Sequence, residues 1–158
     1  MKGTCMDTEA YIAMAKGLPI DGHYDYENDS DENGLRKAEW LKTGVNIARE
    51  LAKALGLPPG SFDVRTNPAG PAVSGDVHLH GEWVYVSLEQ TCLGPAFGFM
   101  WRLCRGRKDY TGCGNQWAGW DELLDLPRLA AKMRASLCLP SAPSGVGRRT
   151  TKAAVWKS

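Results

Sequence analysis

The pattern of hydrophobic and polar positions changes from a helical spacing to a strand spacing near residue 60. Within residues 35–55 the apolar side chains recur at three- and four-residue steps: Leu41, Val45, Ala48, Leu51, Ala52 and Leu55. This spacing places them on one face of an α-helix. Gly56 follows where a left-handed C-cap belongs, and Pro58 and Pro59 prevent continuation. The sequence therefore predicts an amphipathic helix over about residues 35–55.

Alternating positions after residue 60 predict four β-strands. Residues 62–66 form the first, and Gly81-Glu82 predicts a two-residue hairpin loop between the next two. That loop would pair His80 with Trp83, Leu79 with Val84, His78 with Tyr85 and Val77 with Val86. A fourth strand, residues 97–104, would add Phe97, Phe99, Trp101 and Leu103 to the apolar face and Met100, Arg102 and Cys104 to the other.

These elements predict an α+β fold, in which a four-stranded antiparallel sheet carries the long helix on its apolar face. A short helix is expected over residues 8–16, and a second, C-terminal helix over about residues 127–138. We divide the chain into an acidic N-terminal segment (1–34), one α+β domain (35–138) and a basic tail (139–158) rich in Pro, Ser and Gly.

Composition supports a globular protein with one core. The chain has 158 residues, 43% hydrophobic and 23% charged, and no apolar run approaches the ~18 residues of a membrane span. The five cysteines are odd in number and lack a C-x-x-C spacing, and the N-terminus lacks an apolar signal region. We therefore expect a cytoplasmic protein with no membrane partner, no disulfide framework and no cofactor.

Charge is unevenly distributed although the net charge is only +1. Residues 1–34 carry two lysines against eight acidic residues, whereas residues 102–158 carry eleven basic residues against four acidic ones. Two interpretations remain open. Either the acidic segment folds onto the basic third, or the basic third binds a nucleic acid or an acidic protein surface.

A metal site is one alternative for the polar face of the hairpin. His78 and His80 are two positions apart on one strand, so their side chains would point to the same side about 7 Å apart. A third ligand would have to come from Asp63, Cys104 or Cys113, none of which has a diagnostic spacing. Arg105, Arg107 and Lys108 could also activate a cysteine as a nucleophile. The other interpretation is that these histidines are hydrogen-bonding members of a half-exposed face.

Aromatic and cationic side chains gather on this face and in the loop after residue 104. Such groups stack on bases, pair with phosphates and make up protein hot spots. In the loop, Asp109 would instead serve the structure if it paired with Arg107 or capped local amides. The candidate binding residues are Arg65, His78, His80, Trp83, Tyr85, Arg102, Arg105, Arg107, Lys108, Tyr110 and Trp117.

Three segments together resemble small, uncharacterised accessory proteins of tailed bacteriophages, over about residues 35–125. They are the helix followed by Gly-Leu-Pro, the strand segment 73–80 and the Gly-Arg-Lys-Asp-Tyr-Thr-Gly loop, 106–112. Cys113 stands where that pattern has another glycine. The resemblance carries no established activity, but it implies a protein that acts in the host cytoplasm by binding host machinery.

These observations favour a non-enzymatic accessory or inhibitor protein that binds a host protein or a nucleoprotein complex. The first alternative is a zinc-assisted enzyme that uses His78, His80 and a cysteine such as Cys104. The second is an accessory domain that binds nucleic acid.

Overall fold

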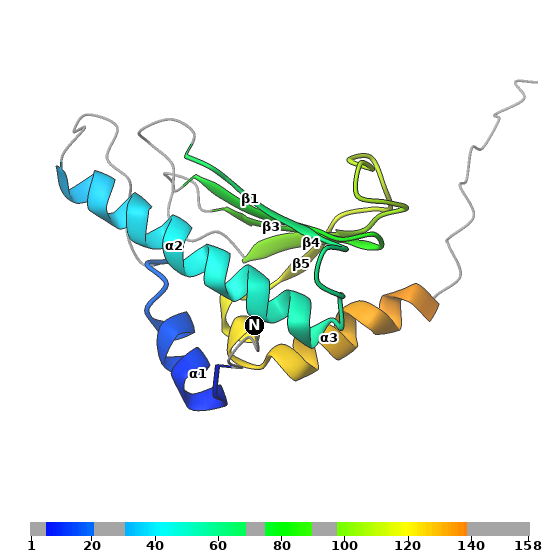
Figure 1. Ribbon diagram of the computed structural model, residues 1–158, viewed down its shortest axis with the longest axis horizontal. Coiled ribbons are helices and arrows are strands. Elements are labelled where there is room, and N and C mark those ends of the chain that lie inside the picture. Colours follow the sequence, from blue (N-terminus) through cyan, green and yellow to red (C-terminus); the bar gives the residue numbers. More distant parts are fainter. Residues whose placement is uncertain (1–5, 21–30, 69–74, 90–97, 139–158) are drawn as a thin grey trace, which may run out of the picture.

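The computed structural model of the protein describes residues 6–20, 31–68, 75–89 and 98–138 and confirms the α+β fold class. Its centre is an antiparallel sheet of five strands, whereas about four were predicted. The strands lie side by side in the order in which they occur along the chain. The strands are β1 (Asp63–Asn67), β2 (Asp76–His80), β3 (Val84–Glu89), β4 (Phe99–Leu103) and β5 (Gln116–Ala118). The helices α1 (Thr8–Lys16), α2 (Asp31–Ala54) and α3 (Leu126–Ala135) all lie on one side of this sheet (Figure 1).

Two helices end or begin as their residues predict. Gly56 has a φ of 67° and donates its N–H to Lys53 O, while Leu57 donates to Ala52 O, both at 2.9 Å. These two bonds form a Schellman motif, which confirms the expected C-cap. The helix α1 has its predicted bounds and is capped by the Asp7 carboxylate, which accepts from Ala10 N at 2.8 Å.

The apolar stripe of α2 is turned slightly from its predicted position. Trp40 and Ile47 have no exposed surface, whereas Leu41 and Val45 are only partly buried. A stripe centred on Trp40 buries the largest apolar side chain of the helix, which favours this rotation. The approach to β2 is close at Gly44, because a Cβ atom built there would lie 2.8 Å from Val77 Cγ2.

The predicted register of the hairpin is wrong by two residues. His80 faces Tyr85, not Trp83, and Leu79 faces Val86, not Val84. The turn falls on Glu82 and Trp83, and Gly81 donates its N–H to Val84 O at 2.9 Å. Gly81 is not among the glycines with positive φ, so it does not form the glycine-first turn on which the prediction depended. Because the shift is an even number of residues, each strand keeps its predicted faces.

Two further differences lie near the C-terminal end. The strand β5 was not expected, because only three residues between glycine-rich segments form it. The predicted helix 127–138 is α3 followed by a 3₁₀ turn, η2 (Ser136–Cys138), and a 3₁₀ helix, η1 (Trp120–Leu124), precedes it.

The core extends into the segment expected to precede the domain. In α1, Tyr11 and Ala15 belong to the buried cluster, and Tyr11 donates its hydroxyl hydrogen to Leu123 O at 2.7 Å. Phe97, residues 1–5 and 21–30 of the acidic segment, and the tail from residue 139 lie outside the described residues. None of the described helices combines the length and apolar composition needed to cross a bilayer.

Candidate binding surface

One side of the sheet is turned away from α1, α2 and α3 (Figure 1), and we call it the open face. The strand positions that alternate with the core residues Val77, Leu79 and Val86 lie on it, and most of them are polar. Its middle row crosses all five strands, because each residue is the register partner of the next. This row consists of Arg65, His78, Ser87, Met100 and Trp117. Trp117 is 59% exposed and lies at the β5 edge.

Two shorter rows flank the middle row. The upper row consists of Asp63, His80, Tyr85 and Arg102. The lower row consists of Asn67, Asp76 and Glu89, so it is acidic. The sheet register therefore joins the predicted residues Arg65, His78, His80, Tyr85, Arg102 and Trp117 on one face of the sheet, where His80 is buried at 5% exposure.

Tyr85 lies at the centre of a cluster of rings. Its hydroxyl is 2.8 Å from His78 Nδ1, and the two rings are stacked with centroids 5.6 Å apart. Arg102 places its guanidinium carbon 4.7 Å from the centroid of the Tyr85 ring, a cation–π contact. Burial raises the pKa of Tyr85, which the Arg102 charge opposes. The ring is therefore a neutral hydrogen-bonding group and not an ionised nucleophile.

The segment between β4 and β5, residues 104–115, folds back onto the upper row, and we call it the β4–β5 loop. His80 Nε2 lies 3.1 Å from Gly106 O, and the Tyr110 ring meets the His80 ring edge-on at 5.0 Å. Arg102 donates to Tyr110 O. Tyr110 is nevertheless 53% exposed, so it covers His80 on one side and faces solvent on the other.

Two acidic residues hold the β4–β5 loop in place. Asp63 forms an ion pair with Arg107 at 2.8 Å, and Arg107 also donates a hydrogen bond to Gly60 O at 2.9 Å. Asp109 accepts from Arg105 N and Thr111 N, both at 3.0 Å, which is the amide-capping role considered above. The hydrogen bond from Arg107 lowers the pKa of Asp63, and the two backbone N–H groups lower that of Asp109.

The three cations of the β4–β5 loop therefore differ in role. Arg107 is held within the molecule by Asp63 and Gly60, and not by Asp109 as the structural interpretation of the loop had it. Arg105 and Lys108 have exposed side chains. These two residues are the cations that the loop presents to solvent.

The metal and nucleophile alternatives receive no support from this geometry. His78 and His80 each place a ring nitrogen against an acceptor or donor of the fold, and Cys104 donates its thiol hydrogen to Gly81 O at 3.4 Å. Burial lowers the pKa of His80 and raises that of Cys104, so both stay neutral. Within the described ranges no three His, Cys, Asp or Glu side chains converge on a position for a metal ion.

Trp83 is the one predicted aromatic residue that the open face does not include. It lies in the β2–β3 turn and packs, partly buried, against the hydrophobic core. The physical reason is the register shift, which moves Trp83 out of the ladder and leaves His80 opposite Tyr85.

The open face has two small hollows. The first, of about 180 Å³, is lined by Arg65, His78, His80, Tyr85 and Tyr110. The second, of about 200 Å³, is lined by Ser87, Glu89, Gly98, Phe99, Met100, Asn115 and Trp117. Sequence reasoning missed the second hollow, because β5 was not predicted and Trp117 had no partner strand. Its only sequence signal was a tryptophan at the end of a glycine-rich loop.

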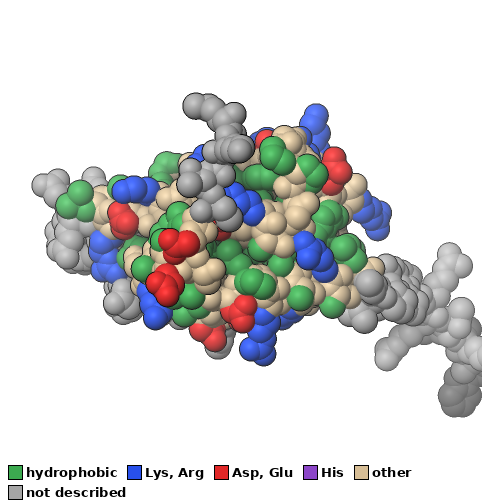
Figure 2. Space-filling model, turned by 60° about the horizontal axis from the view of Figure 1, so that its bottom comes forward, with side chains coloured by type: hydrophobic (Ala, Val, Ile, Leu, Met, Phe, Trp, Pro, Cys, Tyr) green, Lys and Arg blue, Asp and Glu red, His purple; other side chains and the backbone are tan. Residues whose placement is uncertain are grey.

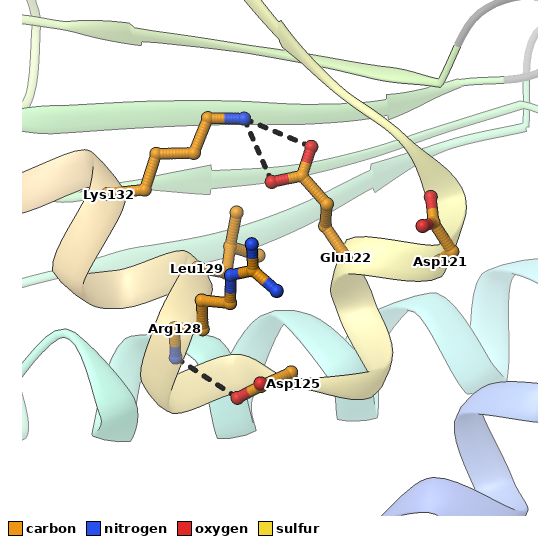
Figure 3. A pocket seen from close by; sticks show the side chains of 6 residues that line it. All are labelled: Asp121, Glu122, Asp125, Arg128, Leu129 and Lys132. Carbon is orange, nitrogen blue, oxygen red and sulfur yellow. Dashed lines mark hydrogen bonds and ion pairs between the residues drawn. The ribbon is translucent and has the colours of Figure 1, made fainter.

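A larger hollow of about 610 Å³ lies on the opposite side, between η1 and α3 (Figure 3). Lys132 donates to both carboxylate oxygens of Glu122, at 2.8 and 3.0 Å, and Asp125 accepts from Arg128 N. Burial would raise the pKa of Glu122, but the hydrogen bonds from Lys132 and Gly119 lower it. Lys132 and Glu122 therefore pair with each other beside this hollow, and Asp125 caps α3, so we interpret these contacts as part of the packing of η1 against α3.

The helix side has no patch of one chemical kind in the view of Figure 2. Acidic, basic and hydrophobic side chains are interspersed there among the described residues. The concentration of rings and cations on the open face therefore contrasts with the helix side.

Comparisons of the chain with protein-family models, with curated proteins and with solved structures give no match. The function is therefore argued from the open face and the β4–β5 loop.

Proposed function

We propose that this chain is a non-enzymatic binding protein that engages its partner through the open face and the β4–β5 loop. The observation that carries this proposal is the exposure of Tyr110 (53%) and Trp117 (59%) on one surface that also holds Arg102 and Lys108. Large aromatic and arginine side chains supply much of the binding free energy at interfaces.

The internal bonds of this surface favour binding over catalysis. Tyr85, His78 and His80 are joined to each other or to the backbone, so their rings are held in fixed positions. A surface fixed in advance loses less conformational entropy when a partner binds. No described group on it combines a lowered pKa with the geometry of an activated nucleophile.

The resemblance to accessory proteins of tailed phages provides the biological setting of the proposal. In that setting the protein acts in the host cytoplasm, as an accessory or inhibitor protein that binds a host protein or a nucleoprotein complex. Nucleic acid alone is the alternative partner.

The test is affinity capture from a bacterial lysate with the tagged full chain, with and without nuclease. We expect a specific partner for the wild type and its loss in the double variant Tyr110→Ser, Trp117→Ser. The matched control is Leu137→Ser, which changes another large exposed side chain (49%) on η2, outside the open face. Equal capture by all three proteins would contradict the proposal.

A further inference from the structure

We infer that the partner of the open face is a single-stranded nucleic acid, whose bases occupy the two hollows. This inference rests on the proposed binding surface and, of the partners named above, assigns it the nucleic acid, either within a nucleoprotein complex or alone. It depends on three features: the size and lining of the hollows, the placement of the cations, and the position of the acidic lower row.

The two hollows suit flat groups. At about 180 and 200 Å³ they are smaller than the ~300–1,000 Å³ pockets that enclose drug-sized ligands. The first has aromatic walls, with the His80 ring edge-on to Tyr85 at 5.1 Å and to Tyr110 at 5.0 Å. The second has the exposed Trp117 ring at its rim. The exposed rings on which a base can stack are therefore Tyr110 at the first hollow and Trp117 at the second.

The hollows are close enough for one strand to reach both. His78 lines the first and its register partner Ser87 lines the second. Neighbouring strands are ~4.8 Å apart and residues rise ~3.4 Å along a strand, so Tyr85 on β3 and Trp117, two strands and one row away on β5, are ~12 Å apart. A duplex keeps its bases stacked inside, whereas a single strand can turn its bases into both hollows.

The positions of the charged residues indicate the path of the nucleic-acid backbone across the open face. Arg65 borders the first hollow and pairs with Asp63 at 3.6 Å, but its side chain is still 65% exposed. Arg102 lies over Tyr85, and Lys108 is exposed on the loop. Phosphates would follow these cations, because ion pairing and counterion release favour that path. The acidic lower row, with Asp76 and Glu89, lies on the other side and repels phosphates.

Glu89 would also contact a base, because it lines the second hollow together with Ser87 and Asn115. A carboxyl group at this place can accept a hydrogen bond from an exocyclic amino group, as of cytosine. An acidic peptide would use the same cations and be repelled by the same lower row, but it would leave both rings without a stacking partner. The observations therefore favour the nucleic acid.

The test uses fluorescence anisotropy of the full chain with three labelled probes. They are a mixed-sequence single-stranded oligonucleotide, the duplex of the same sequence, and a polyglutamate peptide. We expect the single strand to bind at least tenfold more tightly than the other two probes. Tyr110→Ser and Trp117→Ser should each weaken binding about 5- to 140-fold, the equivalent of ~1–3 kcal/mol per stacked base.

Control variants separate stacking from charge. Tyr110→Phe and Trp117→Phe keep a ring and should retain most of the affinity, and Leu137→Ser should retain all of it. Lys108→Ala should weaken binding and reduce the salt slope by ~0.7, the value for one phosphate contact with a single strand. The tail from residue 139 carries four further cations, so salt-sensitive binding alone does not support the inference.

The remaining results distinguish failure of the inference from failure of the proposed function. Binding of the single strand that is unchanged in Tyr110→Ser and Trp117→Ser would overturn the inference, as would equal binding of the duplex. If neither oligonucleotide binds but lysate capture is nuclease-resistant and lost in the double variant, the inference fails and the proposed function stands. If no oligonucleotide binds and capture from the lysate does not depend on the open face, both the inference and the proposed function are wrong.

Discussion

The two sides of the β-sheet use alternate positions of the same strands for different purposes. On the helix side, Val77, Leu79 and Val86 are at most 1% exposed and belong to the core. On the open face, the neighbouring positions carry His78, Tyr85 and other polar residues that bond to each other or to the β4–β5 loop.

The difference shows how one sheet can separate stability from binding. Burial of apolar surface on the helix side supplies most of the favourable free energy of folding. The polar bonds of the open face replace bonds to water, so each adds little net stability but fixes the direction of a ring. Substitutions on the two sides should therefore have unequal effects on stability, and the following predictions test this.

The largest effect is expected from Leu51→Ala on the helix side. Leu51 has no exposed surface, and truncation of a buried leucine leaves a cavity that costs about 2–5 kcal/mol. Met100→Ala on the open face, where Met100 is only half-buried, should cost less than half as much. Urea titration of both variants measures this, and equal losses would mean that the open face is also core.

A smaller effect is expected at the contact between α2 and β2. Gly44→Ala improves helix propensity by ~1 kcal/mol, but its new methyl group would lie 2.8 Å from Val77 Cγ2. We expect a net loss of about 1–3 kcal/mol, as for other overpacked sites. In a Val77→Ala background the same change should be neutral or stabilising. A double-mutant cycle measures this coupling, and additive effects would show that the helix does not approach the strand so closely.

The smallest effect on stability is expected from the open face, where protonation of His80 should make the stability depend on pH. Burial lowers the pKa of folded His80 below its unfolded value of about 6.5, so the unfolded chain binds more protons in that interval. The stability due to neutral His80 is therefore complete above about pH 6.5 and is lost as the pH falls toward the folded pKa. Urea midpoints across this window should fall on acidification in the wild type and fall less in His80→Gln. Parallel curves for the two proteins would contradict the assigned burial of His80.

The resemblance to phage proteins and the proposed binding function are separate from these stability tests. The stability of either side of the sheet does not depend on what the open face binds.

Local chemistry was enough to predict much of the fold. The Gly56 cap, the bounds of α1, the faces of β2 and β3 and the α+β class all follow from interactions between residues close in sequence. A helix cap needs only the backbone of its own last turn, and the strand period of two does not depend on which partner lies opposite. For the same reason the polar face containing His78, His80 and Tyr85 could be recognised before any pairing was known.

The tertiary structure alone decided what depends on residues distant in sequence. It set the hairpin register and removed Trp83 from the open face, it added β5 and with it the second hollow, and it tied Arg107 to Asp63 across the sheet edge. Three residues have too little periodicity to predict a strand, and the partner of a loop arginine depends on where the whole loop folds. The sequence by itself therefore determined which side chains are available for binding, and the packing of the chain decided which of them meet.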